Sequence, residues 1–246
     1  MANFKPLKNY LLYLIDQLIE KYNIEGPFLD AGCGIGDISL HLAQKGWSGK
    51  AIDLYQPSLE VATNCLSKYK DRIIIEKQDI LLEQAKYKTI IVCDVLEHIK
   101  KDHEILQHLS SLMNKESKII ISVPIFMKEW RWDDNFYGHI RRYEIKRLEK
   151  IINESHLKIV EIWDFTFPVF WFMRRVYTRF LKKSMTLTKK QRILTLQSAS
   201  HNAWGNGKIF YLIENFPVWK IIFFLQSKFK KYLLGSECIL LAEKII

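Results

Sequence analysis

The stretch that decides the fold is Phe28-Leu29-Asp30-Ala31-Gly32-Cys33-Gly34-Ile35-Gly36-Asp37. It begins as a short apolar strand, ends that strand in an acid and turns through glycines toward a helix. Glycine suits such a turn because the backbone must turn tightly and let a ligand approach without a Cβ in the way. The dinucleotide fingerprint G-x-G-x-x-G fails, because Asp37 stands where its last glycine would be. Asp30 would repel a pyrophosphate but not an amine, so the turn favours a cofactor that carries a cationic amine.

Short β-rich runs alternate with helix-like stretches around this turn, from residue 26 to 163. Most of the runs are continuously apolar, which is typical of strands covered on both faces. The alternation predicts an α/β fold: a Rossmann-like, doubly wound, mostly parallel seven-stranded sheet with a closing antiparallel strand. An amphipathic helix is expected before the first strand. The expected strands are Pro27–Asp30, Lys50–Asp53, Ile73–Lys77, Thr89–Cys93, Ile119–Val123, Lys158–Trp163 and Cys238–Glu243. The expected helices between them are Asp37–Lys45, Pro57–Tyr69, Lys101–Met113 and Glu144–Ser155.

Polar residues follow three further strands of the expected sheet. Asp53 ends the second strand, where an acid can accept hydrogen bonds from ribose hydroxyls. Gln78-Asp79-Ile80 follows the third strand, and Cys93-Asp94-Val95-Leu96-Glu97-His98 follows the fourth. All of them lie at the carboxyl ends of strands, where open α/β sheets bind ligands. Any one acid could be an ordinary strand-end residue or helix cap, and Glu97 and His98 could be solvated residues of a first helical turn.

The ordered set resembles the class I S-adenosylmethionine-dependent methyltransferases, and is similar to small-molecule and lipid-pathway enzymes of the ubiquinone-methyltransferase type. The motifs cover Pro27 to Trp163 and the closing strand. The resemblance implies S-adenosylmethionine as cofactor and S-adenosylhomocysteine as product. It places Asp30 near the methionine portion, Asp53 at the ribose, and Asp79 with Ile80 at the adenine. The cofactor-binding residues that it implies are Asp30, Ala31, Gly32, Gly34, Asp53, Leu54, Asp79, Ile80, Cys93 and Asp94.

Some quinone-precursor O-methyltransferases bind a divalent metal through carboxylates and a histidine after the fourth strand. Here that run offers Asp94, Glu97 and His98, one carboxylate fewer than such a pattern needs. We therefore expect no metal. Cys33 and Cys93 are interpreted as small packing residues rather than nucleophiles.

Residues 125–143 form the expected substrate loop, because aromatic and titratable groups crowd it without a helical or strand period. Loops over the carboxyl end of a sheet bind substrates, and an aromatic loop can exclude water. Its Gly138-His139-Ile140-Arg141-Arg142-Tyr143 resembles an element of many bacterial small-molecule methyltransferases. His139 is the candidate catalytic base, since imidazole can accept a hydroxyl proton at neutral pH. Alternatively, His139 and Tyr143 organise the loop. The expected substrate-binding residues are His98, Trp130, Tyr137, Arg142 and Tyr143.

Positive charge is concentrated in one segment. The chain carries a net charge of +10, yet Phe165 to Ser236 holds 13 Lys and Arg against a single acid, Glu214. The segment is also aromatic, and two helices are expected in it, Pro168–Lys183 and Pro217–Leu234. Basic amphipathic helices with Trp and Phe bind anionic membranes, which is the interpretation we favour. The alternatives are a helical cap on the sheet or on a second subunit, and a nucleic-acid surface.

Length and composition fit one globular unit of 246 residues with an elaboration. The expected division is a core with its leading helix at residues 1–164, a basic helical insertion at 165–236 and the last strand at 237–246. Four scattered cysteines and the lack of a signal peptide or spanning segment indicate the cytoplasm, with peripheral contact at the membrane. The sequence thus predicts a methyltransferase for a small amphipathic or lipid-linked acceptor, methylated on O or N. A soluble sugar or metabolite methyltransferase and a nucleic-acid-binding protein are the alternatives; the oligomeric state does not follow.

Overall fold

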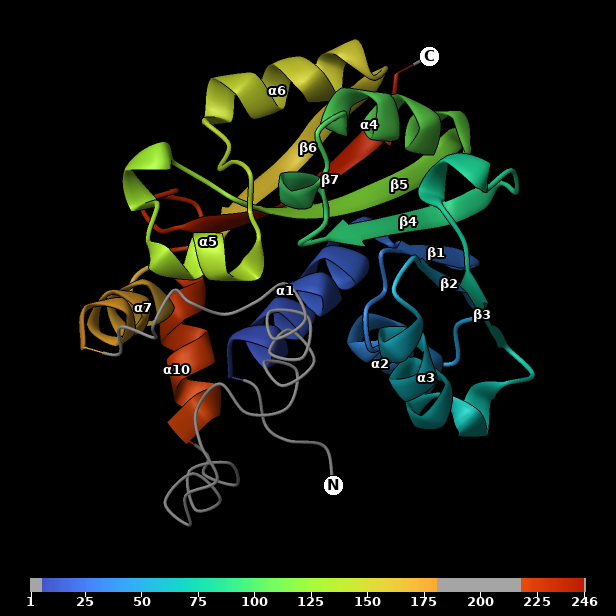
Figure 1. The fold of residues 1–246 in the computed structure, drawn as a ribbon, viewed down its shortest axis with the longest axis horizontal. Coiled ribbons are helices and arrows are strands. Elements are labelled where there is room, and N and C mark those ends of the chain that lie inside the picture. The colour runs from blue at the N-terminus through green and yellow to red at the C-terminus, as the bar shows by residue number, and fades with distance from the viewer. Residues whose placement is uncertain (1–5, 181–217, 246) are drawn as a thin grey trace.

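One sheet organises the computed structural model, which describes residues 6–180 and 218–245 (Figure 1). Its strand order is β3-β2-β1-β4-β5-β7-β6. Strands β1 to β5 pair in parallel, whereas β7 runs antiparallel to both β5 and β6. The expected fold class is therefore confirmed. The strands are β1 Phe28–Ala31, β2 Gly49–Asp53, β3 Ile73–Lys77, β4 Tyr87–Cys93, β5 Met113–Pro124, β6 Leu157–Asp164 and β7 Glu237–Lys244.

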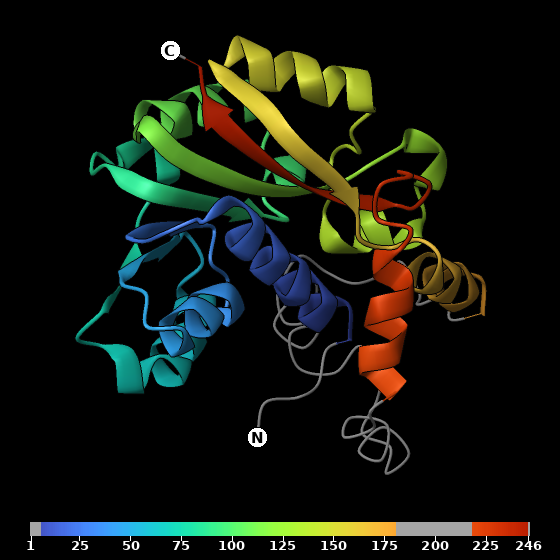
Figure 2. The ribbon, with the colours of Figure 1, turned by 180° about the vertical axis from the view of Figure 1, so that it is seen from behind.

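Helices cover both faces of this sheet, as Figures 1 and 2 show from opposite sides. The continuous apolar runs explain why: alternate residues of one strand enter different cores. In β4, Ile90 and Val92 join α4 and α6, while Ile91 and Cys93 join α1 and α2. The helices are α1 Pro6–Tyr22, α2 Asp37–Gln44, α3 Gln56–Cys65, α4 Asp102–Ser111, α5 Trp132–Tyr137, α6 Ile145–Glu154, α7 Val169–Phe180 and α10 Val218–Ser227. Single 3₁₀ turns are η1 Ser67–Tyr69, η2 Ile80–Leu82, η3 Leu96–His98 and η4 Met127–Glu129.

The register of the central strands brings their carboxyl ends together. Asp30 of β1 pairs with Ala51 of β2 on one side and with Ile91 of β4 on the other. Two residues further along, β2 ends at Asp53 and β4 ends at Cys93. Residues that are distant in sequence therefore meet at one edge of the sheet, as the parallel arrangement requires.

The structure changes two expectations about local elements. The expected substrate loop contains regular secondary structure, because η4 and the short helix α5 lie within it. The second basic helix ends at Ser227, not at Leu234, and a turn follows it. Part of the expected basic insertion, residues 181–217, lies outside the described residues.

The described parts of the basic segment are anchored to the core. Tyr10 of α1 contacts Phe170 of α7 and Phe223 of α10, with ring centroids 5.7 Å and 5.1 Å apart. The buried carboxylate of Asp164, at the end of β6, accepts the backbone N–H groups of Thr166 and Gly235, and so joins the beginning and the end of the segment. Within the described residues, no helix combines the length and the apolar character needed to cross a membrane.

Candidate functional site

The glycine-rich turn lies between β1 and α2 and is held against β2. Gly32, Gly34 and Gly36 all have positive φ, at 83°, 54° and 81°, where a side chain would be strained. A Cβ on Gly32 would lie only 2.5 Å from Val95 Cγ2. The N–H groups of Gly32 and Cys33 both donate to the carbonyl of Ile52, at 2.9 Å. The turn is therefore a rigid cradle.

A cavity of about 230 Å³ opens beside this cradle. Of the expected cofactor residues, it is lined by Asp30, Gly32, Gly34, Cys93 and Asp94. Six further residues that the sequence did not indicate for the site also line the cavity. They are Lys8, Cys33, Ile35, Asp37, Ile38 and Ser58. The cavity thus lies at the carboxyl ends of β1 and β4, with carboxylates and glycine backbone on its wall.

Asp30 is the buried carboxyl of this cavity. Its side chain is buried, and Oδ2 accepts a 2.6 Å hydrogen bond from the Ser39 hydroxyl. Burial raises the pKa of Asp30 to about 6, against the opposing effects of Ser39 and of the Lys8 ammonium. A cationic amine in the cavity would favour the ionised carboxylate.

Lys8 is the functional candidate that sequence reasoning missed. It comes from α1, which the sequence marked only as a leading amphipathic helix, and it lines the cavity. Burial alone would lower its pKa, but the pKa is raised because Asp94, Asp37 and Asp30 lie near its ammonium group. The cavity therefore carries both a positive charge and negative charges, which are complementary to the two charges of a zwitterionic ligand.

Asp53, at the end of β2, is hydrogen-bonded to the glycine-rich turn. Its Oδ2 accepts from the N–H of Gly34 at 2.9 Å, and its Oδ1 accepts from the N–H of Tyr55 at 2.8 Å. Each oxygen keeps a further lone pair. Ala31 is buried in the strand and Leu54 is 62% exposed. Asp79 caps η2 through Leu81, and Ile80 packs in the core.

Asp94 follows β4 in the left-handed region, with φ of 58°. Its Oδ1 accepts a 2.7 Å hydrogen bond from the Ser122 hydroxyl, and its N–H donates to the Ser122 carbonyl. Backbone strain of this kind is concentrated at functional sites. The neighbouring thiol of Cys93 is buried, which raises its pKa to about 12 and agrees with a packing residue.

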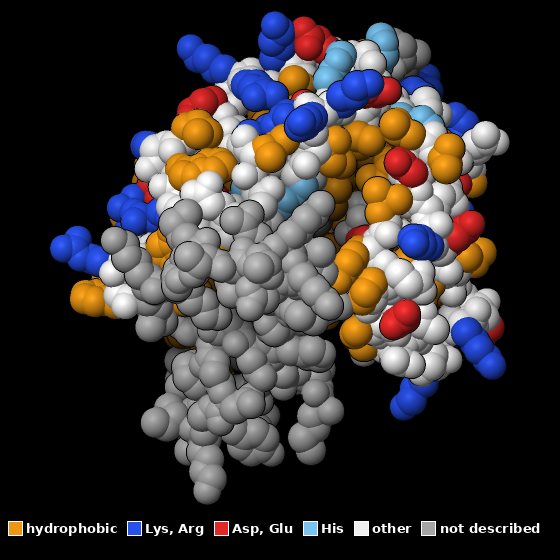
Figure 3. Space-filling model, in the orientation of Figure 1, with side chains coloured by type: hydrophobic (Ala, Val, Ile, Leu, Met, Phe, Trp, Pro, Cys, Tyr) orange, Lys and Arg blue, Asp and Glu red, His pale blue; other side chains and the backbone are white. Residues whose placement is uncertain are grey.

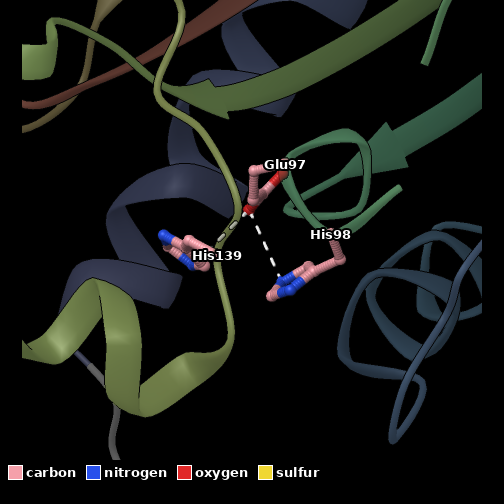
Figure 4. Close-up of side chains that lie close together, drawn as sticks. All are labelled: Glu97, His98 and His139. Carbon is pink, nitrogen blue, oxygen red and sulfur yellow. Dashed lines mark ion pairs between the residues drawn. The ribbon is translucent and has the colours of Figure 1, made fainter. Parts of the chain in front are cut away.

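A second cluster lies on the acceptor side, where η3 meets the segment after α5 (Figure 4). The Nε2 atoms of His98 and His139 lie 3.8 Å and 3.9 Å from Oε1 of Glu97. Burial raises the pKa of Glu97 well above its usual range and, with the charge of His139 nearby, lowers the pKa of His98. The N–H of Ile140 donates to the Glu97 carbonyl, which holds the two segments together.

Asp134 orients the imidazole of His139 through its Nδ1 atom, on the side away from Glu97. Its Oδ1 lies 2.9 Å from His139 Nδ1 and accepts from Arg142 Nε at 2.8 Å. Oδ2 accepts from the N–H of Arg131 and from Arg174. Although burial alone would raise it, the pKa of Asp134 is far below its usual range because of these partners. The carboxylate is therefore ionised and fixes the imidazole.

The structure separates the expected substrate residues into two groups. His98 is exposed, Trp130 and Tyr137 are partly buried, and the rings of Tyr137 and His139 lie 6.3 Å apart. Arg142 and Tyr143 are fully buried: Arg142 bonds the carbonyls of Ile125 and Ser236, and the Tyr143 hydroxyl bonds Asp102. No surface of these two is left for an acceptor, so they organise the loop instead.

The surface around the site is hollowed and apolar on the face that Figure 3 shows, with basic side chains crowding its upper rim. At the left of the same view, over α7, apolar and basic side chains lie next to each other. The exposed large apolar residues of α10 and the turn after it are Ile221, Phe224, Leu225, Phe229, Tyr232 and Leu234, with exposed Lys220, Lys228 and Lys231 among them.

Comparison with known proteins agrees with this geometry. A family model described as a methyltransferase domain matches residues 6–162. A ubiquinone biosynthesis O-methyltransferase of Rickettsia canadensis is 29% identical over 123 residues, which are 48% of this chain and 52% of that protein. The chain thus spans about half the length of the curated relatives it matches.

Solved structures show the same fold. A S-adenosylmethionine-dependent methyltransferase from Clostridium acetobutylicum superposes with a TM-score of 0.60 at 14% identity, covering 97% of this chain and 92% of that one. Magnesium protoporphyrin IX methyltransferase from Synechocystis, solved with bound SAM, gives 0.51 at 22% identity, covering 66% and 77%. With most of the core matched by the family model, the chain belongs to the methyltransferase domain family, and the expected class I S-adenosylmethionine-dependent type is confirmed.

Proposed function

We propose that this protein transfers a methyl group from S-adenosylmethionine to a hydroxyl of a small amphipathic acceptor at a membrane surface. The single observation that carries the cofactor assignment is the cavity at the ends of β1 and β4, lined by the glycine turn, Asp30 and Asp94. The relatives named as O-methyltransferases support an oxygen acceptor.

The residues present fit a zwitterionic nucleoside. Asp30 and Asp94 would bind its amine, Lys8 would bind its carboxylate, and the backbone of Gly32 and Gly34 leaves room for close approach. The free lone pairs of Asp53 would accept the ribose hydroxyls. Asp79 and Ile80 remain the proposed adenine contacts, and Ala31, Leu54 and Cys93 remain proposed cofactor contacts at the strand ends.

When bound, S-adenosylmethionine supplies a methyl group that is already activated on a cationic sulfur. The chain therefore has to align the acceptor and exclude water. Trp130 and Tyr137 are proposed to shield the acceptor. His139 is proposed as the base: its Nδ1–H donates to Asp134, and the lone pair of Nε2 is available to take the hydroxyl proton.

The membrane surface is inferred from the exposed side of α10. Ile221, Phe224 and Leu225 are each more than half exposed, and Lys220 and Lys228 flank them. Apolar side chains can enter the acyl boundary while lysines bind anionic headgroups. A soluble metabolite as acceptor is the second candidate; nucleic acid is disfavoured because phosphate-binding surfaces do not need such an apolar face.

Calorimetry with S-adenosylhomocysteine tests the cofactor assignment. We expect binding by the full chain, and at least a tenfold weaker affinity for Asp53→Ala, since hydrogen bonds to a charged group are worth about 1.5–3 kcal/mol. Asp71→Ala, a change of an exposed aspartate outside the cavity, serves as control. Unchanged affinity in Asp53→Ala would contradict the ribose assignment, and no binding at all would overturn the function.

A further inference from the structure

Arg131, directly before α5, carries a positive charge without a partner. Among the described residues its guanidinium makes no ion pair, and its Nε atom, which is hidden from solvent, has no hydrogen-bond partner. The two neighbouring arginines of α7 are paired. Arg174 binds the Asp133 carboxylate at 2.7 Å, and Arg175 binds the Glu129 carboxylate. A partly buried cation that lacks such a partner is costly to the folded protein.

Further positive charge acts on this guanidinium. Burial lowers the pKa of Arg131, and the charges of Arg175 and Arg174 lower it further, although the Glu129 carboxylate opposes them. Arginine stays protonated in proteins, so the charge remains in place despite this environment. An anion beside the guanidinium groups of Arg131 and Arg175 would compensate it.

Other polar atoms beside Arg131 also lack partners. Within the described part of the chain, Nε of Arg175, the indole Nε1 of Trp171 and Oε2 of Glu129 are buried and unpaired. These residues are in contact: the Arg175 guanidinium lies 3.9 Å from the centre of the Trp171 ring and binds Oε1 of Glu129. Unpaired buried polar atoms are rare in folded proteins, so their concentration here indicates a place where polar atoms of a ligand bind.

Asp134 joins this place to the candidate base. Its Oδ2 accepts from the N–H of Arg131 at 2.7 Å, and its Oδ1 lies 2.9 Å from Nδ1 of His139. Trp130, which is proposed to shield the acceptor, is the residue before Arg131. A molecule that binds at Arg131 therefore lies beside the acceptor site.

We infer that Arg131, Arg175 and Trp171 bind a phosphate monoester group of the acceptor, an assignment that rests on the proposed function. Phosphate oxygens accept from indole and guanidinium N–H groups, and the planar fork of arginine matches them. A phosphate monoester is singly protonated below about pH 6, and its O–H can then donate to Oε2 of Glu129. A carboxylate group would not bring such a donor.

The apolar part of this acceptor has a surface next to the phosphate site. Phe172, Val176 and Phe180 recur every four residues along α7 and are all exposed. Residues four apart lie on the same side of a helix, so these three form an apolar stripe. Trp171 and Arg175, each one residue earlier, lie along its border. The unpaired charge and the stripe together fit a phosphate at one end of an apolar chain.

Calorimetry with soluble amphiphiles tests the inference without any measurement of activity. The full chain is titrated near pH 6 with decyl phosphate below its micelle concentration, and we expect one molecule to bind per chain. Decanoate, which has the same chain length and a carboxylate head, should bind at least about tenfold more weakly, and so should inorganic phosphate. Decyl phosphate binding no more tightly than decanoate, or not at all, would overturn the inference.

Variants identify the residues of the site. Arg131→Gln and Arg175→Gln should each weaken decyl phosphate binding by at least about tenfold, because charge-assisted hydrogen bonds are the strong ones. Arg72→Gln is the matched control: it removes the same charge from an exposed residue before β3, at the other edge of the sheet. Unchanged affinity in Arg131→Gln contradicts the site.

The stability of the free protein distinguishes a ligand-binding arginine from a structural one. Arg131→Met removes an unpaired charge and keeps the apolar stem, so it should not lower the Tm, whereas Arg142→Met should lower it. Decyl phosphate should raise the Tm of the parent chain and not that of Arg131→Met. Equal losses of Tm in the two variants would make Arg131 structural and overturn the site.

A bilayer lipid is the other source of a phosphate group. Sedimentation with phosphatidylglycerol vesicles compares the parent chain with Arg131→Gln. If the phosphate belongs to the acceptor, both proteins sediment alike. A loss of vesicle binding in Arg131→Gln as large as its loss of decyl phosphate binding would assign the site to the bilayer and refute the acceptor assignment. Binding of S-adenosylhomocysteine by the same samples tests the proposed function separately.

Discussion

At the cofactor cavity, a closely packed glycine lies next to charged side chains. Gly32 lies against Val95, where no side chain fits, and Asp30 is buried beside it with one hydroxyl partner. Lys8 brings the compensating cation from a helix that begins the described chain. Small changes at these positions should therefore have large effects.

Gly32→Ala is expected to destabilise the protein by about 3 kcal/mol, measured as the free energy of unfolding in urea. The positive φ costs about 1–2 kcal/mol, and the contact with Val95 adds an overpacking cost of similar size. Gly46→Ala is the matched control, because Gly46 has φ of 90° with no atom near its Cβ position. Equal losses in the two variants would show that the contact with Val95 does not matter.

The affinity for S-adenosylhomocysteine should depend on pH through Asp30. Because the pKa of Asp30 is raised to about 6, the free protein binds a proton there below pH 6. A cationic amine favours the carboxylate, so affinity should fall by up to about tenfold per pH unit as the pH drops below 6. Calorimetry in buffers of different ionisation enthalpy should detect proton release near pH 6. In Asp30→Asn both effects should disappear, and their persistence would assign them to another group.

At the scale of elements, the segment from η4 to Tyr143 is held by buried ion pairs, while Tyr143 at its end joins the apolar core. Asp134 lies at its centre, bonded to Arg142, Arg174 and His139. The segment thereby places His139 beside η3. Its shape should depend on these charges.

Arg142→Met is expected to cost about 3–5 kcal/mol of unfolding free energy at pH 7, because it removes one buried cationic partner of Asp134 and the donor to the buried carbonyls of Ile125 and Ser236. Since the pKa of Asp134 lies below its ordinary value of 3.8, this stabilisation is present above pH 4 and is lost at lower pH. The penalty should therefore shrink in acid. Lys150→Met breaks the exposed pair with Glu154 and should cost less than about 0.5 kcal/mol. A similar loss in both variants would refute the role of burial.

At the scale of the whole molecule, the basic segment is fixed to the sheet at its two ends and to α1 through aromatic contacts. Figure 2 shows α10 beside α1, on the face opposite α6. The exposed side of α10 thus belongs to a helix whose other side packs on α1 and α7. Peripheral membrane binding by this side remains a proposal.

Sedimentation with vesicles measures that binding. We expect the full chain to bind phosphatidylserine-containing vesicles at low salt and to bind phosphatidylcholine vesicles much less. Phe224→Ser with Leu225→Ser should reduce binding by at least tenfold, since each change removes about 1.5–3 kcal/mol of apolar burial in the membrane. Leu82→Ser, which changes an apolar residue 69% exposed on η2, is the control. Failure of the parent chain to bind anionic vesicles would exclude the membrane proposal.

The sequence by itself determined the sheet, the class of fold and the family. Those properties depend on local signals: apolar runs, glycines at the first turn and acids at strand ends. All expected strands were found, with Ile73–Lys77 in the same bounds and the others shifted or extended at their ends. Asp30 and Asp94 could be placed at the cavity because parallel strands bring their carboxyl ends to one edge.

Only the tertiary structure decided which distant residues share a site. Lys8 reaches the cavity because α1 packs across the sheet, and His139 meets Glu97 because Ile140 bonds to the carbonyl of Glu97. Arg142 and Tyr143 read in the sequence as loop residues beside a substrate, but packing buries them. The physical reason is that a strand period is encoded in neighbouring residues, whereas contacts between distant segments depend on how whole elements pack and pair their charges.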